Sequence, residues 1–190
     1  MDRTALFVDA GYLLACGSKL SLNNPKAARS QCKVRVAALA HDLMERVKDL
    51  AELPLLRTYW YDGTWDQKRT DEQADVLEAS LVKLRLGKNT ISGQKGVDSL
   101  IFRDLTTLAR ERAICSAFRV SGDEDMREAV AMVQDLGVQV TLISVEPVPG
   151  QDYENTSQGL LDEVDLVETL DFDWIAKYFE PKSRKSAADG

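Results

Sequence analysis

The chain has 190 residues, of which 44% are hydrophobic and 29% charged, and its formal net charge is −7. This length and balance suit one soluble domain with a substantial core, and the negative charge disfavours general electrostatic adhesion to nucleic acid. No apolar stretch is long enough to span a bilayer. An aspartate interrupts the apolar N-terminal segment and no small-residue cleavage site follows it, so we expect no signal peptide and a cytoplasmic protein.

Short apolar runs that end in turn residues alternate with segments of helical periodicity along the chain. In the first half of the chain we predict a strand over 4–11, a loop over 17–31, a helix over 34–51, a strand over 53–63 and a helix over 70–86, with Ala74, Leu77, Leu81 and Leu84 facing inward. A loop over 87–96, a helix over 97–112, a strand over 113–122, a helix over 124–137 and a strand over 138–145 follow. The last predicted elements are a loop over 147–159, a short helix and a fifth strand near 158–168, and a final helix over 171–179.

Strands that alternate with helices predict an α/β fold, in which right-handed crossovers build a central, mostly parallel sheet with helices on both faces. We see no internal repeat and no linker, so we expect a single domain over residues 1–179. The polar segment 180–190 predicts a disordered tail.

Carboxylates follow several of the predicted strands. Asp9 ends the first strand and Asp62 the second, while Asp123 and Asp125 come directly after the third. Asp98 begins the helix that leads into that third strand. Because the carboxyl ends of parallel strands form one edge of a sheet, where sites in such folds lie, these acids are expected to converge there.

Two interpretations of these acids remain open. Each acid by itself could be a helix cap or a turn residue, since aspartate suits both positions. Together they could hold a metal ion, because several carboxylates are costly to pack without a cation. A zinc site is disfavoured, since the three cysteines show no Cys-x-x-Cys spacing and His41 is the single histidine. Oxygen ligands indicate Mg²⁺ or Mn²⁺.

Charge is distributed unevenly along the sequence. Residues 83–112 contain seven basic and three acidic side chains, whereas residues 121–173 contain fourteen acidic side chains and one basic side chain. This pattern could form a rim that guides phosphates beside a metal centre, or simply two solvated faces of opposite sign.

Four segments resemble the NYN domain family, a branch of the PIN-like nucleases. They are "LFVDAGYLL", "WYDG", "KGVDSLIFRDLTTLA" and "VSGDEDMREAVAMVQDLGVQVTLI", and the resemblance covers roughly residues 4 to 170. It implies a Mg²⁺- or Mn²⁺-dependent ribonuclease that acts on RNA through an acidic pocket. The matching ligands are Asp9, Asp98 and Asp123, with Asp125 close by. Asp104 matches a further acid of the family, and Asp62 is a secondary candidate from its position at a strand end.

The first motif departs from the family pattern, because Tyr12 stands where the family often has asparagine. "VDAGYL" resembles a bacterial variant of that motif. Tyr12 is a candidate for stacking on a base, whereas Trp60 is expected in the core. Lys88 and Lys95 precede Asp98 on a polar loop and are candidates for contacts with the RNA backbone. Ser121 is a further candidate for substrate contact.

Two other functions remain in competition with the ribonuclease. One is a catalytically weak NYN module that regulates by binding RNA or a protein. The other, a phosphohydrolase for a small phosphorylated molecule, ranks last because Gly11 stands where an aspartyl-phosphate enzyme has its second aspartate. A homodimer formed through an apolar face is also compatible with the sequence.

Overall fold

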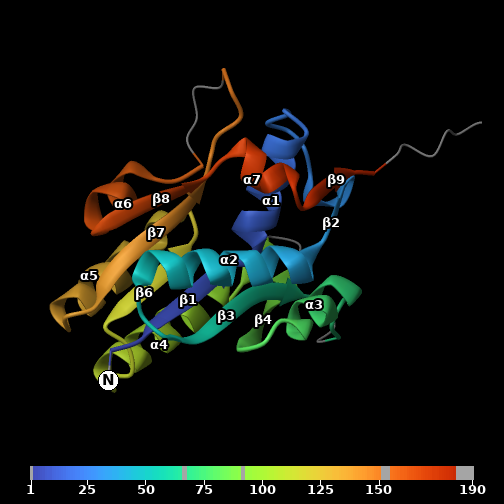
Figure 1. Ribbon diagram of the computed structural model, residues 1–190. Coiled ribbons are helices and arrows are strands. Elements are labelled where there is room, and N and C mark those ends of the chain that lie inside the picture. Colours follow the sequence, from blue (N-terminus) through green and yellow to red (C-terminus); the bar gives the residue numbers. More distant parts are fainter. Residues whose placement is uncertain (1, 66–67, 91–92, 151–154, 183–190) are drawn as a thin grey trace, which may run out of the picture.

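A seven-stranded sheet forms the centre of the protein, in a computed structural model that describes residues 2–65, 68–90, 93–150 and 155–182 (Figure 1). Its strand order is β5-β4-β3-β1-β6-β7-β8. In chain order, the seven strands are β1 (Thr4–Asp9), β3 (Leu55–Thr64), β4 (Val82–Thr90), β5 (Gly93–Lys95), β6 (Ser116–Val120), β7 (Gln139–Val145) and β8 (Leu166–Leu170). All neighbouring pairs are parallel except β4 and β5. A second sheet pairs β2 (Cys32–Val34) with β9 (Phe179–Pro181).

Helices cover both faces of the large sheet (Figure 1). One face carries α1 (Ala10–Ser21), α2 (Val36–Ala51) and α7 (Phe172–Ala176), and the other carries α4 (Val97–Arg110), α5 (Arg127–Asp135) and α6 (Gln158–Glu163). The short helix α3 (Asp71–Asp75) and the 3₁₀ turns η1 (Arg29–Gln31), η2 (Val76–Glu78) and η3 (Glu124–Met126) complete the described elements. The predicted α/β class, with a mostly parallel sheet between helices, is confirmed.

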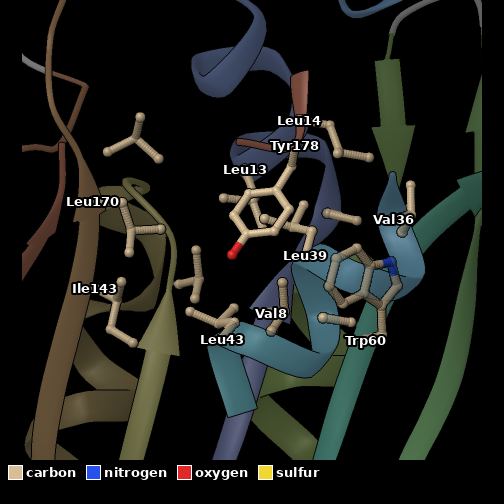
Figure 2. Packing of buried hydrophobic residues seen from close by; sticks show 14 of the residues in the cluster. Val8, Leu13, Leu14, Val36, Leu39, Leu43, Trp60, Ile143, Leu170 and Tyr178 are labelled. Carbon is tan, nitrogen blue, oxygen red and sulfur yellow. The ribbon is translucent and has the colours of Figure 1, made fainter. Parts of the chain in front are cut away.

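The two faces of β1 contribute side chains to two separate hydrophobic clusters, because successive strand residues point to opposite sides. Leu6 and Val8 pack with α1 and α2, whereas Ala5 and Phe7 pack with α4 and α5. Trp60 is buried in the first cluster, as predicted, near Val8 (Figure 2). No helix in the described part of the chain is long and apolar enough to cross a membrane.

The predicted helix over 70–86 is wrong beyond its first turns. Helix α3 ends at Asp75, and β4 begins at Val82 and pairs with β3. Within 82–86, apolar residues alternate with Lys83 and Arg85, which is the period of a strand; the helical spacing of the leucines is a coincidence. Leu81 has a positive φ and is half exposed. The loop predicted over 87–96 is also wrong, since β4 and β5 pair within it.

Helix α1 was not predicted, and its last turns fall in the segment expected to be a loop. Glycines at positions 11 and 17 weaken the helical pattern. Gly17 is needed for packing, because a Cβ atom there would lie 2.4 Å from the ring of Phe179. Strands β2 and β9 were also missed, and the final helix ends at Ala176 rather than 179. Glu180 and Pro181, expected in the tail, pair with β2, and residues 183–190 lie outside the described residues.

Candidate functional site

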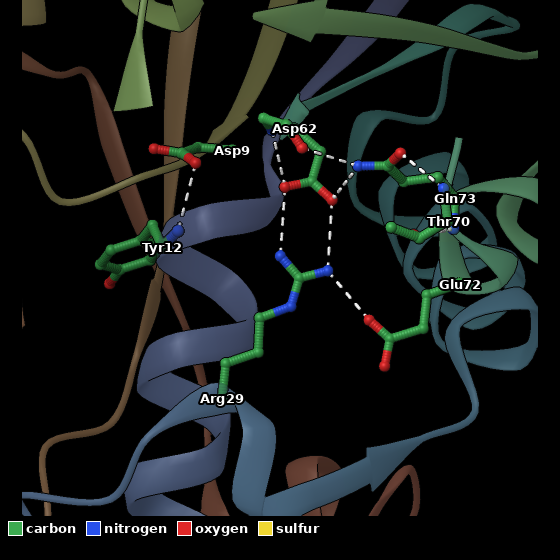
Figure 3. A network of polar contacts seen from close by, with 8 residues as sticks. Asp9, Tyr12, Arg29, Asp62, Thr70, Glu72 and Gln73 are labelled. Carbon is green, nitrogen blue, oxygen red and sulfur yellow. Dashed lines mark hydrogen bonds and ion pairs between the residues drawn. The ribbon is translucent and has the colours of Figure 1, made fainter. Parts of the chain in front are cut away.

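Asp9 lies at the carboxyl end of β1, in the middle of the sheet. It caps α1, because its Oδ1 accepts a hydrogen bond of 3.1 Å from the backbone N–H of Tyr12 (Figure 3). Burial raises the pKa of Asp9 to about 6. That hydrogen bond and the charge of Arg119 oppose the shift, and the charge of Asp98 adds to it. This carboxylate is therefore poorly solvated and lies within the field of a second one.

Asp98 lies in the first turn of α4. The N-cap of that helix is Gly96, whose φ of 83° suits glycine, so the interpretation of Asp98 as a cap is wrong. Burial, followed by the charges of Asp123 and Asp125, raises the pKa of Asp98, and Arg119 opposes this rise. The side chain of Asp98 therefore shares an electrostatic environment with the acids that follow β6.

Asp123 and Asp125 lie in the turn after β6, and both are exposed. Asp123 is the N-cap of η3, since its Oδ1 accepts a 3.1 Å hydrogen bond from the N–H of Asp125. The carboxylate of the intervening Glu124 points away from these two acids, because it accepts a 2.6 Å hydrogen bond from Ser157 Oγ and forms an ion pair with Arg127. The cap interpretation is thus confirmed for Asp123, and Asp9, for which the sequence suggested a turn, is a cap as well.

Asp9, Asp98, Asp123 and Asp125 form a set that we call the acidic centre. Mutual charge effects link them across three different segments, as expected for the carboxyl edge of a parallel sheet. Within the described residues, no group of three or more acidic, histidine or cysteine side chains is arranged so that it could hold a metal ion. The set nevertheless suits Mg²⁺ or Mn²⁺ chemically, because it offers only carboxylate oxygens that repel one another, and a cation relieves that repulsion.

Asp62 is held by a different group of side chains. It is buried, and both its oxygens accept hydrogen bonds from the guanidinium of Arg29, at 3.1 and 3.2 Å (Figure 3). Gln73 Nε2 donates a further bond of 3.0 Å, and Glu72 accepts one of 2.9 Å from Arg29. The charge of Asp62 is therefore already balanced by an arginine.

Asp104 is also paired. Arg85 donates to it through Nε and Nη2, at 2.8 and 3.2 Å, and the hydroxyl of Tyr61 donates at 3.1 Å. Asp104 is buried between β3, β4 and α4. These contacts favour a structural role for both secondary candidates.

Tyr12 and Gly122 fasten the segment 155–157 to the sheet edge. The Tyr12 hydroxyl accepts a 3.0 Å hydrogen bond from the N–H of Val145 and lies 3.2 Å from Thr156 Oγ1. Gly122 accepts a bond of 3.1 Å from the N–H of Ser157, and a Cβ atom at Gly122 would lie 2.0 Å from the Asn155 carbonyl oxygen. The hydroxyl of Tyr12 is thus engaged within the protein, which leaves the ring for any contact with substrate.

The remaining substrate candidates lie in different places. Lys88 is exposed on β4, opposite Lys95 in the β4–β5 register; the side chain of Lys95 lies outside the described residues. Ser121 is buried and accepts a 2.7 Å hydrogen bond from Arg119 Nη2. Arg119 was missed by the sequence analysis, although a charged residue within the apolar run "AFRVS" is a signal for a buried functional cation.

Trp65 is the aromatic residue most open to a ligand near this edge. It is 71% exposed, whereas Trp60 and the stacked pair Tyr59 and Tyr61 are buried. Trp65 lines a cavity of about 640 Å³ at the end of β3, together with Arg29, Asp62, Lys68, Lys182 and other residues of that edge. Asp9 and Tyr61 are partners in the β1–β3 register, so this cavity lies one strand away from the acidic centre.

Asp9→Asn is expected to change the dependence of stability on pH in the metal-free protein. The unfolded carboxyl titrates near pH 4 and the folded one near 6, so its protonation stabilises the fold fully below about pH 4, and this contribution is lost as the pH rises through about 6. At pH 8 the asparagine variant should be more stable by about 2 kcal/mol, because no buried charge remains and the cap is kept.

Urea unfolding in EDTA at pH 4 and pH 8 measures this difference. The difference in free energy of unfolding between the two proteins should be about 2 kcal/mol at pH 8 and small at pH 4. Parallel stability curves for wild type and variant would show that Asp9 does not titrate as described.

Comparison with known proteins gives three findings. The NYN domain family matches residues 3–171. "Uncharacterized protein y4oD" of Sinorhizobium fredii (strain NBRC 101917 / NGR234) is 39% identical over 113 residues, which are 59% of this chain and 51% of that protein. The chain therefore matches about half the length of this relative. A solved structure, the protein of unknown function VPA0982 from Vibrio parahaemolyticus RIMD 2210633, shares the fold with a TM-score of 0.62 at 17% identity, over 94% of this chain and 96% of that one.

Proposed function

This chain belongs to the NYN domain family, whose fold is nuclease-like, and from that premise we propose that it is a metal-dependent ribonuclease. Its substrate is single-stranded RNA, and the ion is Mg²⁺ or Mn²⁺. The observation that carries the proposal is the electrostatic coupling of Asp9, Asp98 and Asp123, which three separate segments bring to one edge of the sheet. Arg29 and Arg85 balance the charges of Asp62 and Asp104, whereas the acids of the centre keep an excess of negative charge that a divalent ion would offset.

Asp9, Asp98 and Asp123 are the residues that would hold the ion, and Asp125, which follows Asp123 in the same turn, would adjust the surroundings of that ion. When bound, a divalent ion makes water more nucleophilic and offsets charge on a phosphodiester. The protein contributes the positions of the carboxylates: the α1 and η3 caps fix Asp9 and Asp123, and the first turn of α4 fixes Asp98. Lys88 and Lys95 on the β4–β5 hairpin are proposed to bind the RNA backbone.

Trp65 is proposed to stack on a base of the bound strand, since an exposed tryptophan beside basic residues suits single-stranded nucleic acid. Trp65→Ala should weaken binding of a single-stranded RNA about tenfold, because one stacked base contributes on the order of 1–3 kcal/mol. Fluorescence anisotropy of a labelled single-stranded RNA, titrated with the protein in EDTA, measures the affinity without cleavage and does not depend on the tryptophan that is removed.

Trp174→Phe is the matched control for this titration. Trp174 packs against Tyr178 beside α2, with the two rings tilted by 56°, away from the carboxyl end of β3, and its replacement should leave the affinity unchanged. Unchanged affinity in Trp65→Ala would remove Trp65 from the binding surface.

A catalytically weak module that regulates by binding RNA or a protein is the second candidate. It is favoured by Tyr12, whose hydroxyl is engaged with Val145 and Thr156 where the family often has asparagine. RNA binding without metal-dependent turnover would support it. A cytoplasmic location and a homodimer remain predictions, for which fractionation and analytical ultracentrifugation are the tests.

A further inference from the structure

We propose that Arg119 is the resident cation of the acidic centre, a positioning residue that limits the centre to one divalent ion and weakens the binding of that ion. The inference rests on the proposed metal-dependent function and adds a determinant of ion number and affinity. It is carried by the burial, the contacts and the charge environment of this one side chain.

The position of Arg119 in β6 directs it toward the acidic centre. Its register partners are Phe7 in β1 and Leu142 in β7, which belong to the cluster covered by α4 and α5. Asp98 lies in the first turn of α4, at the same end of the sheet. The side chain therefore lies between the sheet and α4, the helix that carries Asp98.

Arg119 is 1% exposed, and its guanidinium is only partly satisfied by hydrogen bonds. Nη2 donates to Ser121 Oγ at 2.7 Å, whereas Nε and Nη1 are buried without a hydrogen-bond partner among the described residues. Burying a charged donor without a partner is costly unless opposite charges compensate for the lost water. A side chain kept in this state points to an electrostatic role.

Three carboxylates supply that compensation. Burial lowers the pKa of Arg119 to about 10, and the charges of Asp9, Asp123 and Asp98 oppose the fall. Arg119 therefore remains charged at pH 8. With Asp125, the acidic centre carries four negative charges and Arg119 one positive charge, so an excess of three negative charges remains. One divalent ion reduces this excess to one, and a second divalent ion would leave the centre positively charged.

Removal of the positive charge should therefore tighten metal binding. A divalent ion is repelled by Arg119 twice as strongly as a proton at the same place. Loss of the charge also raises the affinity of the acids for protons, but that competition offsets at most part of the gain. We expect Arg119→Met to bind Mn²⁺ at least about tenfold more tightly than wild type, because two like charges that lie close together in a partly buried site repel one another strongly.

The experiment is a calorimetric titration of the full chain with Mn²⁺ at pH 8, where proton competition is small. Wild type should bind one ion per chain, Arg119→Met should bind at least about tenfold more tightly, and Arg119→Lys, which keeps the charge, should stay within about threefold of wild type. Circular dichroism verifies the fold. If Arg119→Met does not fold, Arg119→Gln takes its place, because it also removes the charge and keeps a donor for Ser121.

The outcomes separate the inference from the function beneath it. Equal or weaker Mn²⁺ binding by the uncharged variant, with one ion bound by wild type, would overturn the role of Arg119 and leave the metal site intact. Two ions bound by wild type would also overturn it. No binding by either folded protein would refute the metal site itself, and the inference would fall with it.

Discussion

Asp123→Asn is expected to reduce the rate of RNA cleavage by about a thousandfold, because a divalent ion at the reaction centre contributes several kcal/mol and each 1.36 kcal/mol is a factor of ten. The fold should be kept. Asparagine is as good an N-cap as aspartate, so the hydrogen bond to the N–H of Asp125 survives and the free energy of unfolding should change by less than about 1 kcal/mol. Cleavage of a labelled RNA and urea unfolding measure the two effects separately.

Glu124→Gln provides the matched control for this variant. Glu124 is the next residue in the same exposed turn, and the substitution removes the same charge. Its carboxylate is directed to Ser157 and Arg127 rather than to the acidic centre. Activity should therefore stay close to wild type. Equal losses in the two variants would mean that the net charge of the turn, and not a ligand at Asp123, controls cleavage.

Asp104→Ala is expected to have the opposite profile, with a large loss of stability and no loss of metal binding. Its carboxylate accepts hydrogen bonds from Arg85 and Tyr61 in a buried position. Removing one partner of a buried ion pair leaves the other without compensation and costs about 3 kcal/mol or more. The free energy of unfolding from urea titration measures this loss, and Mn²⁺ calorimetry of the folded variant tests the second half of the prediction.

Asp104→Asn refines the interpretation. The amide keeps the size of the side chain and an oxygen that can accept from Tyr61, but it loses the charge facing Arg85, so a smaller loss of stability is expected. A stable Asp104→Ala with weakened Mn²⁺ affinity would contradict this assignment. Asp104 would then be a ligand of the ion rather than the anchor of α4 to β3 and β4.

The residues that could be placed from the sequence are those for which local pattern and topology agree. Asp9 and Asp123 end apolar runs, and strand ends of a parallel sheet meet at one edge, so their approach could be predicted. The same rule selected Asp62, and the family resemblance selected Asp104, but both carboxylates are paired with arginines in the structure. Sequence spacing could not show that Arg29 and Arg85, distant along the chain, would neutralise them.

The errors in the fold have a similar origin. The segment 82–86 fits both a helical and a strand pattern, and only its pairing with β3 decides between them. Helix α1 has two glycines that lower its propensity, and it forms because Leu13, Leu14 and Leu20 are buried against the sheet and α2. Arg119 shows the limit most clearly: its buried guanidinium acquires meaning only from three acids that lie elsewhere in the sequence.

The most direct test of the central claim is cleavage of an end-labelled single-stranded RNA by the purified wild-type chain with Mg²⁺, with Mn²⁺ and with EDTA. The account predicts cleavage with at least one of the two ions, none in EDTA, and recovery when the ion is restored in excess. A folded protein that binds the RNA but cleaves it with neither ion would contradict the account, and the chain would then be a binding module built on a nuclease-like fold.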